Sequence, residues 1–188
     1  HGLVYNDPVK PHSPYGFTDT VAKTGSLYME SLLYWRACLH MFRMTSSPSD
    51  KELYLQRCNA IESSIKYLYH SDSHAFLAAT DDCAQIDIWG IAYMLYINFP
   101  CTDEIKSDIL TFLKDYYDRY VLHGQIRHLL SGEYWERLLI EIPHEEYQNG
   151  AYWATASGWV IWCLAQIDEK LAARTLYDVV SYFQKEGS

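Results

Sequence analysis

The chain has 188 residues, of which 49% are hydrophobic and 21% charged, so it has enough apolar material for a folded core and is not an intrinsically disordered chain. Fifteen Lys and Arg against 24 Asp and Glu give a net charge of −9, and nucleic acid is not an expected partner because its phosphates would be repelled. The apolar runs are broken well before the roughly 20 residues that a transmembrane helix needs, so we expect a soluble chain with no membrane partner.

Three pairs of helices are predicted along the chain. In each pair a helix that is apolar on most faces comes first and an amphipathic helix follows. The first members are predicted at residues 24–44, 84–98 and 151–166, and the second members at 49–69, 103–121 and 168–185. A short loop joins the two members of each pair, which is typical of antiparallel helical hairpins. The expected fold class is all-α, in one domain over residues 1–188, with three inner and outer helices alternating.

Longer polar and aromatic segments lead into the three inner helices. They cover residues 1–23, which are expected to be non-helical, 70–83 and 122–150. Since each segment meets an inner helix at its N-terminus, all three are expected at one end of the domain. Alternating residues on both sides of SGEYWE predict a small β-hairpin near 124–142. The Thr-Asp-Thr sequence at 18–20 is expected to cap the first helix, and Thr102 the fourth.

The polar groups that suit chemistry concentrate in the same three segments. An acid and a second carboxylate facing each other across an aromatic groove are what the cleavage of a glycosidic bond requires. Asp87 and Glu133 are the preferred catalytic pair, with Asp19 and Glu136 as replacements. Asp87 lies in a strongly apolar stretch, where a carboxylate must be hydrogen-bonded or functional. Asp19 serves equally well as a helix cap.

Aromatic and polar side chains near these acids are candidates for substrate binding. Aromatic residues make up 15% of the chain, with 17 tyrosines, and such rings suit either a wet concave surface or the seams between helices. The expected stacking rings are Tyr15, Trp89, Trp135, Tyr147, Tyr152 and Trp153, and the expected hydroxyl-binding groups are Arg127, His128, Gln148 and Asn149. Glu145 and Glu146 are expected to be a solvated charge pair.

The five cysteines show neither a C-x-x-C pair nor a histidine at zinc-site spacing, so we expect no metal and no other cofactor. An odd number of cysteines on predicted helices indicates free thiols in a reducing compartment, and we expect a cytoplasmic protein.

Three segments resemble the six-hairpin glycosidase superfamily. They are YGFTDTVAKTG at 15–25, QIDIWG at 85–90 and YQNGAYWATASGW at 147–159. The resemblance implies an (α/α)6 toroid, with its pocket at the N-terminal ends of the inner helices and a carboxylate pair that usually acts by inversion. The chain has three predicted hairpins where a complete toroid has six. It is therefore the C-terminal portion of a larger domain, or pairs with a complementary half or a second copy, or stands alone with an apolar flank exposed.

The expected function is glycoside hydrolysis on a carbohydrate ligand. Three alternatives stay open at this point. A sugar epimerase of similar architecture would use His128 to move the proton. A glycan-binding or assembly module would keep the rings without turnover. A helical-repeat scaffold would present concave aromatic side chains without buried carboxylates.

Overall fold

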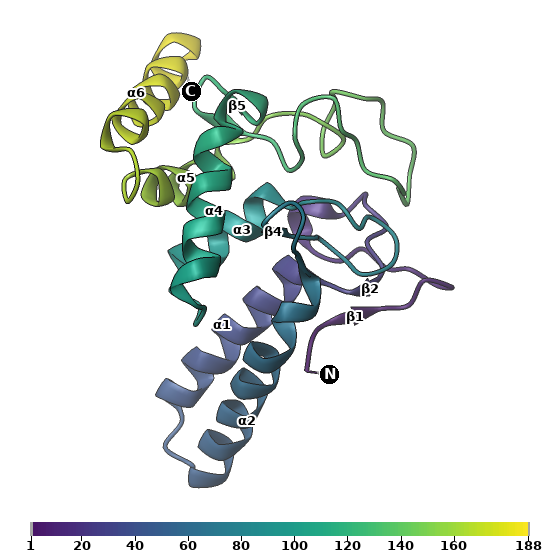
Figure 1. Cartoon of the computed structure of the whole chain (residues 1–188). Helices are drawn as coiled ribbons and strands as arrows, with labels where there is room; N and C mark the ends of the chain where they lie inside the picture. Colours follow the sequence, from purple (N-terminus) through teal and green to yellow (C-terminus); the bar gives the residue numbers. More distant parts are fainter. Residues whose placement is uncertain (1, 188) are drawn as a thin grey trace.

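In the computed structural model, residues 2–187 are described and are mostly helical (Figure 1). This part of the chain contains six α-helices, which are α1 (Tyr28–Met44), α2 (Pro48–Ser64), α3 (Ile88–Tyr96), α4 (Asp103–Asp115), α5 (Ser157–Leu164) and α6 (Glu169–Glu186). Its strands are all two residues long, and they are β1 (Tyr5–Asn6), β2 (Gly25–Ser26), β3 (Tyr69–His70), β4 (Ala75–Phe76), β5 (Val121–Leu122) and β6 (Gln125–Ile126). Six helices in three consecutive pairs confirm the helix-rich fold that the sequence predicts.

The α3 helix lies at the centre of the helical part and contacts α1 on one side and α5 on the other. Seven of its nine residues are buried, whereas α4 and α6 bury one side each, as their amphipathic sequences predict. The α1 and α2 helices form a long antiparallel pair that projects away from the rest of the chain (Figure 1).

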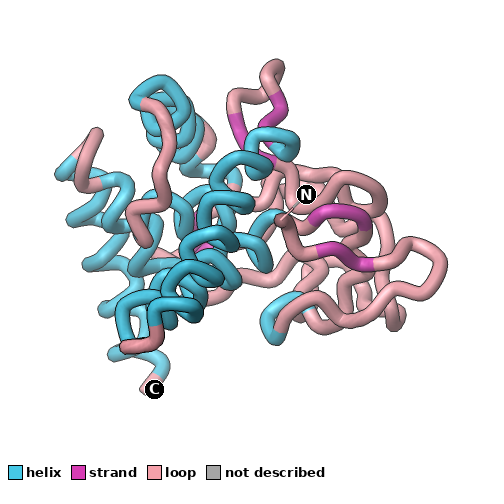
Figure 2. The backbone as a smooth tube through the Cα atoms, turned by 90° about the horizontal axis from the view of Figure 1, so that it is seen from below, coloured by secondary structure: helices cyan, strands magenta, loops and turns pink. Residues whose placement is uncertain are grey.

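A pair of short antiparallel strands precedes each of the helices α1, α3 and α5. The pairs are β1 with β2, β3 with β4, and β5 with β6. Viewed from below, most of the loops gather on one side of the helices (Figure 2), and the three connecting segments meet, since Val21 bridges Leu138 and Leu27 bridges Ala79. The expectation that the three connecting segments share one end of the domain is therefore confirmed.

The predicted β-hairpin near 124–142 is wrong in its position. The strands that pair are β5 and β6, with Leu122 opposite Gln125, and residues 137–142 form no strand. The two residues between them, His123 and Gly124, both have positive φ angles of 51° and 71°. Two such residues are typical of the tight hairpin turns that match the twist of the strands. This turn therefore places the hairpin at 121–126, ahead of most of the predicted alternating segments.

The inner helices also begin later than predicted. The α1 helix begins at Tyr28, and its N-cap residue Leu27 offers no side-chain oxygen, so the expected cap at residues 18–20 is wrong. The α3 and α5 helices likewise begin late, because Ile86 pairs in a bridge with Leu77 before α3, and Trp153 pairs with Ile126 before a 3-10 turn at Ala154–Ala156 that leads into α5. The predicted Thr102 cap is confirmed, since its hydroxyl accepts a hydrogen bond from the Ile105 amide.

Most of the buried apolar side chains form one core between the helices, and a second small cluster lies among the loops. The second cluster contains Val21, Ala78, Cys83, Leu129 and Trp135. The five cysteines are free thiols, and four of them are buried. No helix within residues 2–187 combines the length and the apolar character required to cross a membrane.

The two helical glycines Gly90 and Gly158 differ in the space around them, and this difference predicts opposite effects of alanine. A Cβ atom at Gly90 would lie 2.6 Å from a ring carbon of Tyr28, whereas a Cβ atom at Gly158 would meet nothing within 4 Å. We expect Gly90→Ala to lower the free energy of unfolding by about 1–3 kcal/mol through overpacking. Gly158→Ala should raise it by about 0.5 kcal/mol, because alanine favours the helix.

Urea denaturation of the two variants and the wild-type chain measures both effects. If the two substitutions changed stability in the same direction, the close packing of α3 against Tyr28 would be refuted.

Candidate functional site

A cluster of buried ionisable side chains lies where α1 and α3 begin. Lys23 precedes α1, Glu30 lies in the first turn of α1, Asp87 is the N-cap residue of α3, and His128 follows β6. All four side chains are buried, with exposed fractions of 0% for Lys23 and 2% for Asp87. The cost of burying charged groups is high unless they are paired, so their grouping in one place is the chemically informative feature of this chain.

The Asp87 carboxyl group caps α3 from within the protein. Its Oδ1 atom accepts a hydrogen bond of 3.1 Å from the Gly90 amide, and a Cβ atom at Gly90 would lie 3.1 Å from Oδ2. Burial raises the pKa of Asp87, while the Lys23 ammonium and the amides of the α3 N-terminus act in the opposite direction. A buried carboxyl group with a raised pKa is suited to hold a proton and to release it to a bound ligand.

Lys23 and Glu30 form an ion pair beside Asp87. The Lys23 Nζ atom lies 2.6 Å from Glu30 Oε1, and both side chains are at least 94% buried. Apart from this ion pair, Nζ and both carboxylate oxygens form no hydrogen bond with any protein atom in residues 2–187. Unsatisfied polar atoms of this kind mark a place where a polar ligand or water is expected.

His128 stacks on Trp89 at the edge of the cluster. Their ring centroids are 3.8 Å apart, and the ring of Trp135 lies 6.0 Å from His128 on another side. Burial, followed by the charge of Lys23, lowers the pKa of His128 to about 3, and the Phe17 carbonyl acts weakly against this. His128 is thus a neutral ring whose two nitrogen atoms lack hydrogen bonds of good geometry within the described chain.

Tyr15 completes the cluster on the side of the N-terminal segment. Burial raises the pKa of its hydroxyl, and the negative charges of Asp87 and Glu30 raise it further. Its ring contacts Phe17, and Phe17 in turn contacts Trp89, with centroid distances of 5.9 and 5.8 Å. Of the expected binding residues, Tyr15, Trp89, His128 and Trp135 are therefore those that lie around Asp87.

The other acids predicted from the sequence lie in different surroundings. Glu133 has a side chain that is 41% exposed, and its carboxylate faces Arg119 at 3.8 Å. Glu136 accepts a hydrogen bond from the Cys83 amide and so joins two loops. Asp19 is exposed, and its charge raises the pKa of the Tyr147 hydroxyl. The carboxylate that lies near Asp87 is therefore that of Glu30, which the sequence analysis did not single out.

The remaining predicted binding residues hold a long loop over the cluster. We call residues 131–150 the covering loop. Within this loop, Gln148 accepts hydrogen bonds from the amide and hydroxyl of Thr20, at 3.1 and 3.0 Å. The side chain of Asn149 bonds to the amide of Trp135 and to the carbonyl of Ile142. These two amide side chains are therefore engaged in holding the loop.

Arg127 fixes the same loop through its charge. Its guanidinium is 2.9 Å from the carboxylate of Glu145 and also bonds to the carbonyl of Glu133. It lies between the rings of Tyr134 and Tyr152, each 5.6 Å from the guanidinium carbon. Glu145 is solvated as predicted, with a side chain that is 55% exposed, but it also pairs with Arg127. Trp153 donates to the Tyr147 carbonyl and lies beneath the end of the loop.

Lys23 and Glu30 are the functional candidates that the sequence analysis missed. Lys23 stands in the apolar context of Val-Ala-Lys, and Glu30 stands in the apolar first half of a helix. A lone charged residue in an apolar run is a signal for a buried pair, but the partner cannot be chosen without knowing that β2 brings the two side chains together. No group of three His, Cys, Asp or Glu side chains within residues 2–187 has the arrangement of a metal site.

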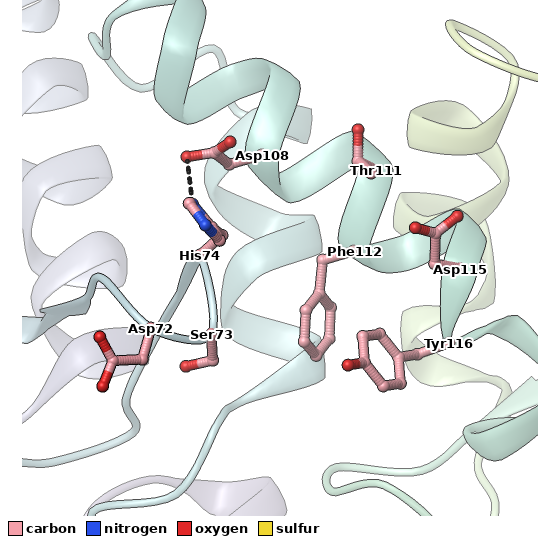
Figure 3. Close-up of a pocket in the computed structure, with 8 residues that line it drawn as sticks. All are labelled: Asp72, Ser73, His74, Asp108, Thr111, Phe112, Asp115 and Tyr116. Carbon is pink, nitrogen blue, oxygen red and sulfur yellow. Dashed lines mark hydrogen bonds and ion pairs between the residues drawn. The ribbon is translucent and has the colours of Figure 1, made fainter.

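A separate concave region lies between the β3–β4 turn and α4 (Figure 3). It has a volume of about 360 Å³, with the stacked rings of Phe112 and Tyr116 on one wall and Asp72 and Ser73 opposite. The carboxylate of Asp108 is already occupied, since it accepts a hydrogen bond from Tyr69 and pairs with His74. None of the residues that line this region belongs to the Asp87 cluster.

Two aspartates that cap helices predict stability changes of opposite sign. The raised pKa of buried Asp87 means that the native carboxyl keeps its proton while the unfolded chain ionises, so its contribution to stability falls as the pH rises from about 4. Asp87→Asn keeps the acceptor for Gly90 and removes this titration. The stability of this variant relative to the wild type should therefore increase between pH 4 and pH 8.

Asp168, the partly exposed N-cap residue of α6, is the matched control. Its pKa is lowered by the Leu171 amide and then by Lys114, so its contribution is present above about pH 4 and is lost at lower pH. Asp168→Asn should therefore be less stable than the wild type at pH 7 and equal to it near pH 2. Urea denaturation across the pH range measures both, and parallel pH profiles for the two variants would refute the assigned environments.

In comparisons with known proteins, no family model matches the chain, and no curated protein or solved structure is significantly similar to it. The side chains of the cluster therefore carry the functional argument that follows.

Proposed function

We propose that this chain is a glycoside hydrolase-like unit that binds a carbohydrate at the Asp87 cluster and protonates a glycosidic oxygen. The observation that carries the proposal is the buried Asp87 carboxyl group, whose pKa burial raises and which lies next to the Trp89 and His128 stack. Aromatic faces bind the apolar faces of sugar rings, and a protonated carboxyl group supplies the proton that a leaving sugar oxygen needs.

The second carboxylate of the proposed reaction is Glu30. Asp87 passes its proton to the bridging oxygen as the bond to the anomeric carbon breaks, and water attacks that carbon. The water gives its proton to Glu30, and Lys23 stabilises the negative charge then left on Asp87. Glu133 was the sequence-based choice for this role, but its exposed carboxylate pairs with Arg119 instead.

The architecture in this proposal is half of an (α/α)6 toroid. Three helix pairs with all connecting segments on one side support it, since those segments would then surround the pocket at the N-terminal ends of α1, α3 and α5. A complementary half or a second copy of the chain would complete the ring. Free thiols at all five cysteines support a reducing compartment, which we propose to be the cytoplasm. Neither nucleic acid nor membrane is a partner in this proposal.

A glycan-binding module without turnover is the second candidate function. This candidate is favoured because the Asp87 side chain is only 2% exposed and already accepts the capping hydrogen bond of α3. The epimerase alternative has less support, because a histidine with a pKa of about 3 is a poor proton acceptor at neutral pH.

Sugar release from a panel of oligosaccharides at pH 5 and pH 7 tests the proposal. We expect Asp87→Asn to lower turnover by about 100-fold or more, because the proton donor is lost. Glu30→Gln should show a similar loss. Asp168→Asn is the control for a helix-capping aspartate outside the cluster, and it should keep full turnover.

Three outcomes would change the conclusion. Loss of activity in Glu133→Gln together with full activity in Glu30→Gln would return the role of base to Glu133. Sugar binding without turnover by the wild type would identify the binding module. The absence of both binding and turnover would refute the proposed function.

A further inference from the structure

Five aromatic side chains of α3 and α5 form a continuous strip, which we call the aromatic track. On α3 they are Trp89, Tyr93 and Tyr96, at the i, i+4 and i+7 spacing that places them on one face of a helix. On α5 they are Trp159 and Trp162, at i and i+3. The two helices contact each other, so these faces are adjacent.

The rings touch one another across the two helices. The centroid of Trp159 lies 6.2 Å from Trp89, 4.9 Å from Tyr93 and 6.4 Å from Tyr96. Tyr96 then meets Trp162 edge to face at 6.1 Å. Trp89, at the end nearest Asp87, is only 1% exposed, so the part of the track that a ligand can reach consists of Tyr93, Tyr96, Trp159 and Trp162.

The track differs from an ordinary core seam in its exposure. Tyr96 is 44% exposed, and Tyr93, Trp159 and Trp162 are only partly buried. Gly158 adds no side chain beside them, since a Cβ atom at this position would meet nothing within 4 Å. Large rings with polar tips that stay in contact with water suit a ligand that is apolar on its faces and polar at its edges.

One end of the track reaches the Asp87 cluster, and the other end reaches a cavity. Trp89 stacks on His128 and contacts the ring of Phe17, which is 40% exposed. Trp162 forms a wall of a cavity of about 190 Å³, whose lining also includes the polar side chains of Asn98 and Lys106. The reachable rings therefore extend from this cavity toward the cluster, and buried Trp89 links them to it through its ring contact with Trp159.

We propose that the aromatic track binds an extended neutral glycan, with several sugar units lying along α3 and α5 away from Asp87. This inference rests on the proposed function and names its substrate class as an oligosaccharide or polysaccharide rather than a single sugar. The sugar faces stack on the rings, and the hydroxyls of Tyr93 and Tyr96, with Asn98 and Lys106 at the far end, bind the sugar hydroxyls. Affinity then grows with chain length.

Calorimetric titration of the Asp87→Asn protein with matched short and long sugars tests the track without turnover. The probes are the disaccharide and hexasaccharide of the β-1,4-glucan, β-1,4-xylan, α-1,4-glucan and chitin series. In the series that binds, the hexasaccharide should bind at least tenfold more tightly than the disaccharide, and Trp162→Ala should remove about tenfold of that affinity. Trp162→Phe should restore most of it, and Tyr177→Ala, which removes an exposed ring of α6, should change nothing.

The outcomes separate the track from the function it rests on. Equal affinity for short and long sugars, with binding retained, overturns the track and leaves the proposed function standing. No binding in any of the four series overturns both. Sedimentation of the wild type and of Trp162→Ala tests whether this face joins two copies of the chain. A wild-type dimer that dissociates in the variant, with unchanged glycan affinity, would overturn the track.

Discussion

The burial of Lys23, Glu30, Asp87 and His128 in one place is the constraint on which the rest of the structure depends. Charged groups are stable inside a protein only when each finds compensation, and here the compensation comes from different parts of the chain. Glu30 comes from the first turn of α1, Asp87 caps α3, and His128 follows β6. The order of hairpin and helix brings these segments to one end of the domain.

The covering loop explains why the cluster is closed. Its fixed points are Arg127 with Glu145 and Thr20 with Gln148, and Trp135 is the ring that it presses toward His128. Because these contacts join the loop to segments on both sides of the cluster, the loop separates the ionisable groups from the bulk solvent. A ligand that reaches Asp87 has to replace some of these contacts with its own.

The sequence predicts the helices well and the connecting segments poorly, for a physical reason. Periodicity records which face of a helix is apolar, so the six helices and the Thr102 cap are recovered from the sequence. The hairpin at 121–126 depends on the turn at His123 and Gly124, whose left-handed geometry outweighs the alternating pattern further along. Thr102 acts locally, whereas the bridge that delays α5 joins Ile126 to Trp153, which are far apart in the chain.

The residues of the candidate site divide in the same way, into those that the local sequence identifies and those whose role depends on the path of the chain. Asp87, Trp89, His128 and Trp135 could be chosen because each is an unusual residue in its local context. Gln148 and Asn149 could not be separated from binding residues, since an amide that holds a loop and an amide that binds a hydroxyl have the same sequence signature. Lys23 and Glu30 are seven residues apart, and their pairing depends on the path of the chain through β2.

The buried thiols can serve as chemical probes of local unfolding. Burial raises the pKa of Cys58 and Cys83 to about 11 and that of Cys163 to about 12, so the reactive thiolate is scarce in the native protein at neutral pH. Cys58 lies on α2, Cys83 lies in the small loop cluster, and Cys163 lies on α5 between α3 and α6. Alkylation of each thiol would therefore report the opening of one region, and the order in which they react would show whether the helices and the loops open together.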